Sequence, residues 1–360
     1  MGRKYYPYID LIRILSMLAI IVLHSASYGL RAYYFSTTWD TLNIITSLAT
    51  CAVPLFFMIS GAMLLSDRKT DNIGYMLKKR LPKLIFPLLF WSLACIARDF
   101  YYIKKNLHVF DPGQLWDTII SILASPAAVH LWFMYALIPL YIAAPFIRRI
   151  ADSDKLIKYL LTIWVLACLL KTAYIAAPEQ LKPLFNISIF NKLNYIDGFL
   201  GYFVLGYYLH EHSFKVKNRI TLPLIMLIIA IIACGTAYAT YKSGEYSEIF
   251  KSYTSVWVIA LSTLIYITAI QAEQLPSKLQ TIINKLSPLS LGIYMSGNFF
   301  LGIMRQEGMT FDTAKGFVLC NIYTFALCFV CITLLKNIKP LCYIATGNRY
   351  KNIFKKQRSV

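Results

Sequence analysis

The sequence is poor in charged residues, and several patterns typical of soluble or secreted proteins are missing from it. Asp, Glu, Lys and Arg together make up 15% of the 360 residues, less than a soluble domain of this length would carry. No short segments of alternating hydrophobicity are present, which argues against a transmembrane β-barrel. The first apolar run is too long for a secretory signal peptide, and no small-residue cleavage site follows it. These absences point to a helical membrane protein.

Apolar residues take the place of the missing charge, since hydrophobic residues make up 58% of the chain. Runs of about 20 apolar residues, the length that a helix needs to cross the core of a bilayer, recur along the whole sequence. The predicted fold class is therefore all-α, a polytopic membrane protein with about ten transmembrane helices. The expected spans lie near residues 8–30, 42–65, 82–103, 130–148, 156–177, 196–212, 220–241, 252–271, 287–305 and 316–336.

The net charge of +19 has a simple source in this class of protein. Lys and Arg collect in the cytoplasmic loops of membrane proteins. With the N-terminus inside, most of the 36 basic residues fall in loops that we expect to be cytoplasmic. This bias favours an even number of spans with both termini in the cytoplasm, and no aromatic–basic module argues for nucleic acid as a partner. We divide the chain into an integral-membrane domain, residues 1–340, and a basic cytoplasmic tail, residues 341–360.

Nearly all of the eight cysteines lie inside apolar runs. Cys328 and Cys331 have the spacing of a redox or metal-binding pair, but they lie in the middle of a span with no histidine nearby. Buried thiols of this kind behave as small hydrophobic side chains. We therefore expect packing thiols and no metal site.

The first span contains three ionisable residues, which are costly in lipid and so indicate a functional site. Arg13 and His24 are eleven residues apart, which is three helical turns plus about 20°, so both side chains point to one face. The rise between them is roughly 16 Å, which places Arg13 at the cytoplasmic end and His24 beyond the midplane. Asp10 lies one turn before Arg13, where it can pair with it. The simpler interpretation is an arginine that snorkels to the interface and a histidine hydrogen-bonded inside the bundle.

Six segments, taken in order, carry a family resemblance. The first contains an arginine, ten further residues and a histidine, which are Arg13 and His24. The segments are IDLIRILSMLAIIVLH (9–24), AVPLFFMISGAMLL (52–65), KKRLPKLIFPLLFW (78–91), HLWFMYALIPLYIAAP (130–145), YFVLGYYL (202–209) and LSPLSLGIYM (286–295). Together they resemble the integral-membrane acyltransferase-3 family, the O-acetyltransferases that decorate bacterial surface polysaccharides. The chain departs from the family at GIYMSG, where Gly297 stands at a position that is often histidine, and Asn298 is the next polar residue.

The resemblance implies an acyl-CoA donor, most often acetyl-CoA, taken from the cytoplasm. CoA is rich in phosphate, and arginine binds phosphate through a planar fork of donors. Arg13, Lys79, Arg80 and Lys83 are the expected donor-binding residues, and Arg80 also matches a family position. The lysines have the simpler interpretation of ordinary cytoplasmic charge.

The resemblance also implies acetyl transfer to a hydroxyl, for which His24 is the expected catalytic residue together with Arg13. We favour His24 as a general base and keep an acetyl-histidine relay as the alternative. The expected acceptor-side residues are His130, Tyr135 and Asp197. A membrane-interface position is the alternative for the first two, and a helix cap is the simpler role for Asp197.

The function expected from the resemblance is transfer of acetyl from acetyl-CoA to an extracytoplasmic glycan or lipid-linked sugar. The expected location is the inner or plasma membrane of a bacterium. Two alternatives remain: a small-molecule transporter, for example of amino acids, and a non-catalytic glycan-export subunit. The lack of a visible internal repeat weakens the transporter. The sequence sets no oligomeric state.

Overall fold

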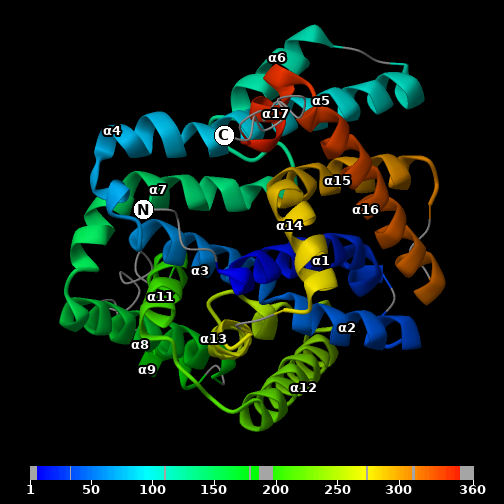
Figure 1. Ribbon diagram of the computed structural model, residues 1–360. Helices are drawn as coiled ribbons and strands as arrows, with labels where there is room; N and C mark the ends of the chain where they lie inside the picture. The colour runs from blue at the N-terminus through cyan, green and yellow to red at the C-terminus, as the bar shows by residue number, and fades with distance from the viewer. Residues whose placement is uncertain are drawn as a thin grey trace.

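The computed structural model describes residues 6–32, 34–108, 111–177, 180–185, 198–272, 275–309 and 313–348, and every regular element within these ranges is helical (Figure 1). The longer helices are α1 (Pro7–Ala32), α2 (Thr37–Ala49), α3 (Ala52–Leu65), α5 (Pro82–Leu107), α6 (Pro112–Ser121), α7 (Trp132–Ile150), α8 (Asp154–Ala176), α11 (Phe199–His212), α12 (Asn218–Ser243), α13 (Val256–Ile270), α14 (Ser277–Leu286), α15 (Ser290–Gln306), α16 (Ala314–Lys336) and α17 (Lys339–Thr346). Short elements join them: α4 (Ile73–Tyr75), α9 (Lys182–Phe185), η1 (Arg68–Asp71), η2 (Met76–Arg80), η3 (Val129–Leu131), η5 (Ile249–Lys251) and η6 (Ser287–Leu289).

The prediction of an all-α polytopic membrane protein is confirmed. Nine helical segments of the described chain are long and apolar enough to cross a membrane, and they match nine of the expected spans. The tenth expected span, near 196–212, corresponds to α11, which has 14 described residues and therefore covers about 21 Å.

The start of α1 and the end of α17 both lie against η6, at one end of the bundle. Ser287 in η6 donates a hydrogen bond to the Asp10 carboxylate near the start of α1, at 2.5 Å. Asn348, just beyond α17, donates to the carbonyl of Pro288, also at 2.5 Å. Since the chain begins and ends its path at the same end, an even number of crossings lies between. We call this the Arg13 end and the opposite one the His24 end.

The C-terminal segment joins the bundle through α17. The Trp91 indole in α5 donates to the carbonyl of Ala345 at 3.0 Å, so α17 packs on α5. The boundary that we expected at residue 340 therefore falls inside a packed helix, while residues 349–360 lie outside the described chain. The division into domain and tail stays a prediction.

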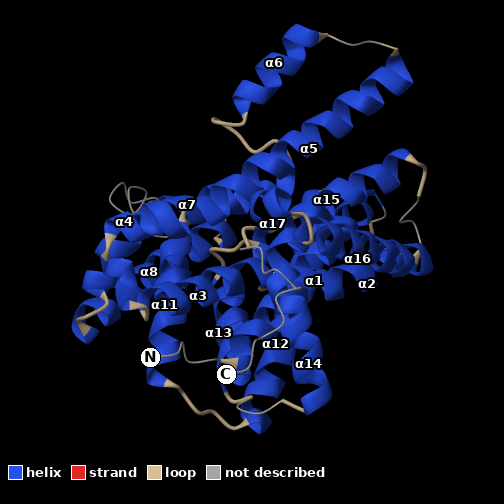
Figure 2. Cartoon of the chain, turned by 45° about the horizontal axis from the view of Figure 1, so that its top comes forward, coloured by secondary structure: helices blue, strands red, loops and turns tan. Residues whose placement is uncertain are grey.

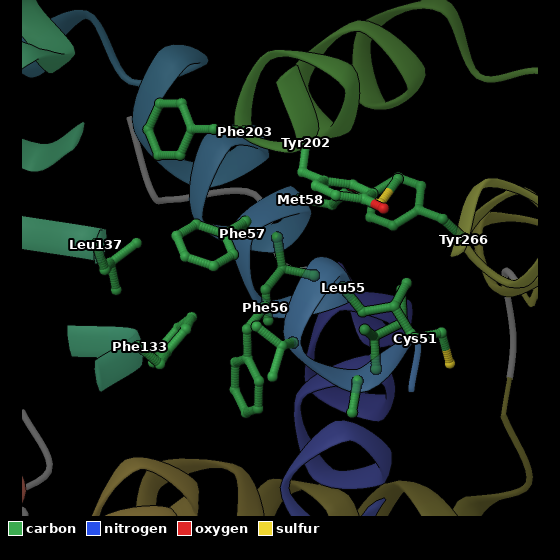
Figure 3. Close-up of a cluster of buried hydrophobic side chains, with 14 of the residues drawn as sticks. Cys51, Leu55, Phe56, Phe57, Met58, Phe133, Leu137, Tyr202, Phe203 and Tyr266 are labelled. Carbon is green, nitrogen blue, oxygen red and sulfur yellow. The ribbon is translucent and has the colours of Figure 1, made fainter. Parts of the chain in front are cut away.

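Helix α3 lies at the centre of the core (Figure 3). It is apolar all round, and 12 of its 14 residues are buried, as expected for a helix with neighbours on every side. Phe57 stacks on Phe199 of α11 with ring centroids 4.3 Å apart and meets Phe133 of α7 at 4.8 Å. Tyr202 and Tyr266 approach the same cluster from α11 and α13.

Two glycines bring the backbones of α3 and α11 into contact. A Cβ atom added to Gly61 would lie 1.7 Å from the Phe203 carbonyl oxygen, and one added to Gly206 would lie 2.0 Å from the Met58 carbonyl oxygen. Small residues allow this close packing of membrane helices. The pair α3–α11 therefore forms the rigid centre against which α1 and α7 pack.

Helix α6 and the outer part of α5 project from the body as an arm (Figure 2). Ile96 and Phe100 of α5 pack with Ile122, which follows α6, in a small apolar cluster separate from the main core. Asp111 caps α6 by accepting from the amide of Gly113 at 2.8 Å. The arm returns the chain to η3 at the start of α7.

Candidate active site

Arg13 and His24 lie on one continuous helix, α1, as the spacing predicted. Helix α15 runs alongside it in the same direction (Figure 1) and contacts it near both ends. At the Arg13 end, Arg13 donates to Ser287 at 3.0 Å, just before α15. At the His24 end, Arg305 near the end of α15 donates to the His24 carbonyl at 2.8 Å. Helix α15 therefore braces both candidate residues.

The Arg13 end holds a small polar cluster. Arg13 Nη1 lies 2.7 Å from Asp10 Oδ1, the pairing that the helical spacing predicted. Ser287 is hydrogen-bonded to both side chains. Together with Asn284 and Pro288 these residues line a pocket of about 430 Å³. Because Arg13 uses only Nη1 in its hydrogen bonds to other described residues, its remaining N–H groups are available to a ligand in this pocket.

The other expected donor-binding residues are not in the lining of this pocket. Arg80, in η2, is paired with Asp67 at 2.9 Å and lies over the ring of Tyr75, and Lys79 is exposed. Lys83 is nearer to the pocket. Its carbonyl packs against Gly347, and the next residue, Asn348, is hydrogen-bonded to the carbonyl of Pro288. The structure thus groups Arg13 with Asp10 and Ser287 and leaves Arg80 in a separate network.

His24 lies in the wall of a second cavity, of about 710 Å³, at the opposite end of the bundle. The cavity is lined by the side chains that follow: Leu23, His24, Ser27, Leu30, Arg31, Thr46, Thr50, Val129, Trp132, Tyr246, Glu248, Ile249, Lys251, Ser252, Tyr253, Asn298 and Arg305. Within the described part of the chain, the His24 ring makes no hydrogen bond. Its nitrogens are therefore available for proton transfer or acylation.

His130 lies directly beside His24, with ring centroids 6.0 Å apart and the rings nearly perpendicular. Its Nε2 contacts the Met295 carbonyl at 2.9 Å, and the Tyr294 hydroxyl donates to the backbone carbonyl of His130. A carbonyl can only accept, so Nε2 carries a hydrogen and Nδ1 of the neutral ring has a bare lone pair. That Nδ1 atom is buried and, among the described residues, has no partner. The sequence predicted His130 at this depth but not its contact with His24.

The other two predicted acceptor-side residues, Tyr135 and Asp197, are not found in the described lining of the cavity. The Tyr135 hydroxyl donates to the Ile122 carbonyl at 2.5 Å, so it holds the loop after α6, and the residue does not line the cavity. Asp197 lies outside the described residues. Asn298 does line the cavity, whereas a Cβ at Gly297 would meet Ile21 of α1 at 3.4 Å. The position where relatives often have histidine thus faces the α1–α15 contact.

Several lining residues were not expected from the sequence, above all Lys251 and Tyr246. Burial, reinforced by the nearby Glu248 carboxylate, raises the pKa of the Tyr246 phenol well above its usual value, so its hydroxyl stays protonated. Lys251 is only 8% exposed. The sequence did contain one signal for Lys251. It is a cation just before the expected span at 252–271, on the extracytoplasmic side, where Lys and Arg are rare.

An apolar septum separates the two pockets. Met17, Ile20 and Ile21 follow Arg13 on the same helix and precede His24, and they are 0%, 3% and 4% exposed. Met17 and Ile20 lie within about 40° of the Arg13–His24 face. No described residue lines both pockets. In this conformation the Arg13 pocket and the His24 cavity therefore have separate linings, and the three apolar residues lie between Arg13 and His24 along α1.

The described residues contain no group of three or more His, Cys, Asp or Glu side chains placed to hold a metal ion. A family model described as an acyltransferase domain, Acyl_transf_3, matches residues 6–335. No curated protein and no solved structure matches the chain. The matched range includes both pockets and every helix from α1 almost to the end of α16.

Proposed function

Because the chain belongs to the acyltransferase-3 family, and is a multi-pass membrane acyltransferase, we propose that it transfers an acetyl group from cytoplasmic acetyl-CoA to a hydroxyl of an extracytoplasmic glycan or lipid-linked sugar. The inner or plasma membrane of a bacterium is the proposed location. The family match favours an enzyme over the two alternatives that the sequence left, a transporter and a non-catalytic export subunit.

The observation that carries the proposal is the position of His24. Its ring faces a cavity of about 710 Å³ and, within the described chain, makes no hydrogen bond, while His130 stands beside it. A histidine free of structural hydrogen bonds, in a large cavity, is placed to take a proton from an acceptor hydroxyl.

The proposed step is direct acyl transfer. A ring nitrogen of His24 takes the hydroxyl proton as the hydroxyl oxygen attacks the thioester carbonyl carbon. The carbon–sulfur bond then breaks, and the CoA sulfur leaves with the proton returned by His24. The products are an acetyl ester and CoA, and the histidine ends in its starting form. His130, fixed by Met295 and Tyr294, limits the orientations open to the His24 ring.

The pocket at the Arg13 end is the proposed site for the phosphates of CoA. Asp10 and Ser287 hold one edge of the Arg13 guanidinium, which leaves Nε and Nη2 for phosphate oxygens. Lys83 lies at the same end, and Arg80 and Lys79 stay proposals for the approach of the donor. The roughly 16 Å rise from Arg13 to His24 is close to the reach of the extended pantetheine arm.

For the thioester to reach His24, the septum of Met17, Ile20 and Ile21 has to open. Methionine has an unbranched, flexible side chain and fills gaps in different shapes. A movement of Met17 is therefore the least costly way to connect the two pockets. We propose that donor binding at the Arg13 end accompanies this opening.

A direct test uses the purified full-length chain in lipid nanodiscs with radiolabelled acetyl-CoA and a panel of oligosaccharide and lipid-linked acceptors. The expected result is an alkali-labile acetyl ester on the glycan, formed in step with CoA release. If no acceptor in the panel gains label while the protein transports an amino acid in proteoliposomes, the transporter alternative is correct.

We expect Arg13→Ala to weaken binding of acetyl-CoA roughly ten- to a hundredfold, the loss of a charge-assisted hydrogen-bonding group worth about 1.5–3 kcal/mol. The measurement is acetyl-CoA affinity by titration calorimetry. Arg219→Ala is the matched control, because Arg219 is exposed at the start of α12. Equal affinities for the wild type and Arg13→Ala would remove Arg13 from the donor site.

A further inference from the structure

The His24 cavity carries an excess of positive charge. Arg31, Lys251 and Arg305 all line it, and Glu248 is the one carboxylate among its described lining residues. Glu248 is ion-paired with Arg31 at 2.9 Å, and both side chains are more than half exposed. The carboxylate is thus engaged at the rim by one cation, while Lys251 and Arg305 add further charge to the wall.

Lys251 is buried but has no carboxylate partner among the described residues. Its Nζ donates to Asn43 Oδ1 at 2.7 Å and to Thr46 Oγ1 at 2.8 Å, both neutral groups on α2. Buried ammonium groups are normally paired with an anion, because desolvation of the charge is costly. The wall therefore holds Lys251 through neutral hydrogen-bond partners, while Glu248, the one carboxylate in the described lining, is ion-paired with Arg31.

The surroundings fix the direction of the Lys251 amine. Asn43 donates through Nδ2 to the Ala233 carbonyl at 2.9 Å, which leaves Oδ1 as the acceptor for lysine. Thr50 in turn donates to the Lys251 carbonyl at 3.0 Å. An ammonium has three donors, and the third contact, to the Tyr246 hydroxyl, is long at 3.4 Å. A ligand oxygen in the cavity can replace or share that third contact.

Aromatic rings line the same cavity. Trp132 and Tyr253 lie with their ring centroids 5.6 Å apart at a 30° tilt, and Tyr246 adds a third ring. Large aromatic side chains provide apolar faces with polar edges, which suit the apolar face and hydroxyl rim of a sugar. A buried cation beside such rings indicates a sugar that also carries negative charge.

We propose that the acceptor is an anionic sugar whose carboxylate or phosphate oxygens bind Lys251 and Arg305, with the reacting hydroxyl turned to His24. This inference rests on the proposed acetyl transfer and adds the substrate class. A carboxylate on the sugar ring and a phosphate linking the sugar to a lipid offer the same oxygen chemistry, so the test separates them.

The experiment compares matched acceptors with the full-length chain in nanodiscs. One pair is a glucuronic-acid oligosaccharide and its neutral glucose counterpart, and a third acceptor is a neutral sugar on a lipid diphosphate. We expect at least a tenfold higher kcat/KM for the anionic member of the pair, or for the diphosphate acceptor. The preference should shrink as ionic strength rises, because salt screens the charge.

Lys251→Met and Arg305→Gln should each bring this ratio close to one. Lys242→Met, an exposed lysine at the end of α12, is the control and should leave the ratio and both rates unchanged. The ratio is internal to each variant, so a lower yield of folded protein does not alter it. If Lys251→Met fails to accumulate, Arg305→Gln and the ionic-strength series decide.

Equal wild-type rates for charged and neutral acceptors would overturn the inference while leaving acetyl transfer in place. A preference for the anionic acceptor that persists in Lys251→Met would overturn it as well. If no acceptor is acetylated, the proposed function fails, and binding alone tests the site. In that case glucuronate or inorganic phosphate should still raise the melting temperature of the wild type and not that of Lys251→Met. No difference between the two would refute the anion site.

Discussion

Replacing His24 with alanine is expected to lower acetyl transfer by about a hundred- to ten-thousandfold, the usual contribution of a positioned acid–base group. Among the described residues that line the cavity, Glu248 is the one carboxylate base, and it is ion-paired with Arg31 at the rim. The Nδ1 atom of His130 is buried, and Lys251 is hydrogen-bonded to Asn43 and Thr46. The alanine variant loses the proton acceptor and the packing of the ring against His130, but it keeps the backbone carbonyl that accepts from Ser27 and Arg305.

The measurement is the single-turnover rate of label transfer to glycan at saturating donor. His108→Asn is the matched histidine control, because His108 is exposed at the end of α5 and asparagine tolerates its positive φ of 55°. Affinity for acetyl-CoA should not change in His24→Ala, since the proposed donor pocket lies at the other end of α1. A variant that transfers acetyl at the wild-type rate would show that His24 is not catalytic.

A measurement of CoA release by the wild-type protein without glycan distinguishes the two possible roles of His24. If His24 acts as a general base, acetyl-CoA stays intact until an acceptor arrives, so no burst of CoA release is expected without glycan. An acetyl-histidine relay would release one equivalent of CoA per chain and leave label on His24. The absence of a burst is the result we expect.

Gly206→Ala is expected to destabilise the protein. The added Cβ would lie 2.0 Å from the Met58 carbonyl oxygen, which is backbone and cannot swing aside, so α3 and α11 must move apart. Overpacking in a core costs about 1–3 kcal/mol and sometimes more. Helix propensity would favour alanine over glycine by nearly 1 kcal/mol, so a loss of stability identifies the helix contact as its cause.

The matched control is Gly198→Ala, at the start of the same helix, where an added Cβ meets nothing within 4 Å. Thermal unfolding followed by size-exclusion chromatography measures both variants. We expect a clearly lower melting temperature for Gly206→Ala and a small change for Gly198→Ala. Similar melting temperatures for the two would mean that the α3–α11 contact is looser than described.

The sequence sufficed for features that depend on periodicity along one helix. The Arg13–His24 separation and the Asp10–Arg13 pair follow from 3.6 residues per turn, and the structure has both on α1. The spans followed from hydropathy for the same reason, because each is a property of a continuous segment.

Periodicity along one helix could not predict the contacts between segments that are distant in the sequence. His130 meets His24 because Met295 and Tyr294 of α15 hold the start of α7, an arrangement of three helices. Lys251 in η5 is hydrogen-bonded to Asn43 and Thr46 of α2, about 200 residues away in the chain. Arg80 was expected at the same cytoplasmic mouth as Arg13, and its donor-binding role stays a prediction. Its ion pair with Asp67, 13 residues earlier, spans two short turns that no periodicity describes.

The septum has a consequence for the energy supply of the cell. An enzyme open to both sides of a membrane at once would let protons and small ions run down their gradients. Met17, Ile20 and Ile21 are buried apolar side chains on α1 between Arg13 and His24, and water is excluded from a tightly packed apolar contact. We therefore expect this conformation not to conduct protons or small ions across the bilayer.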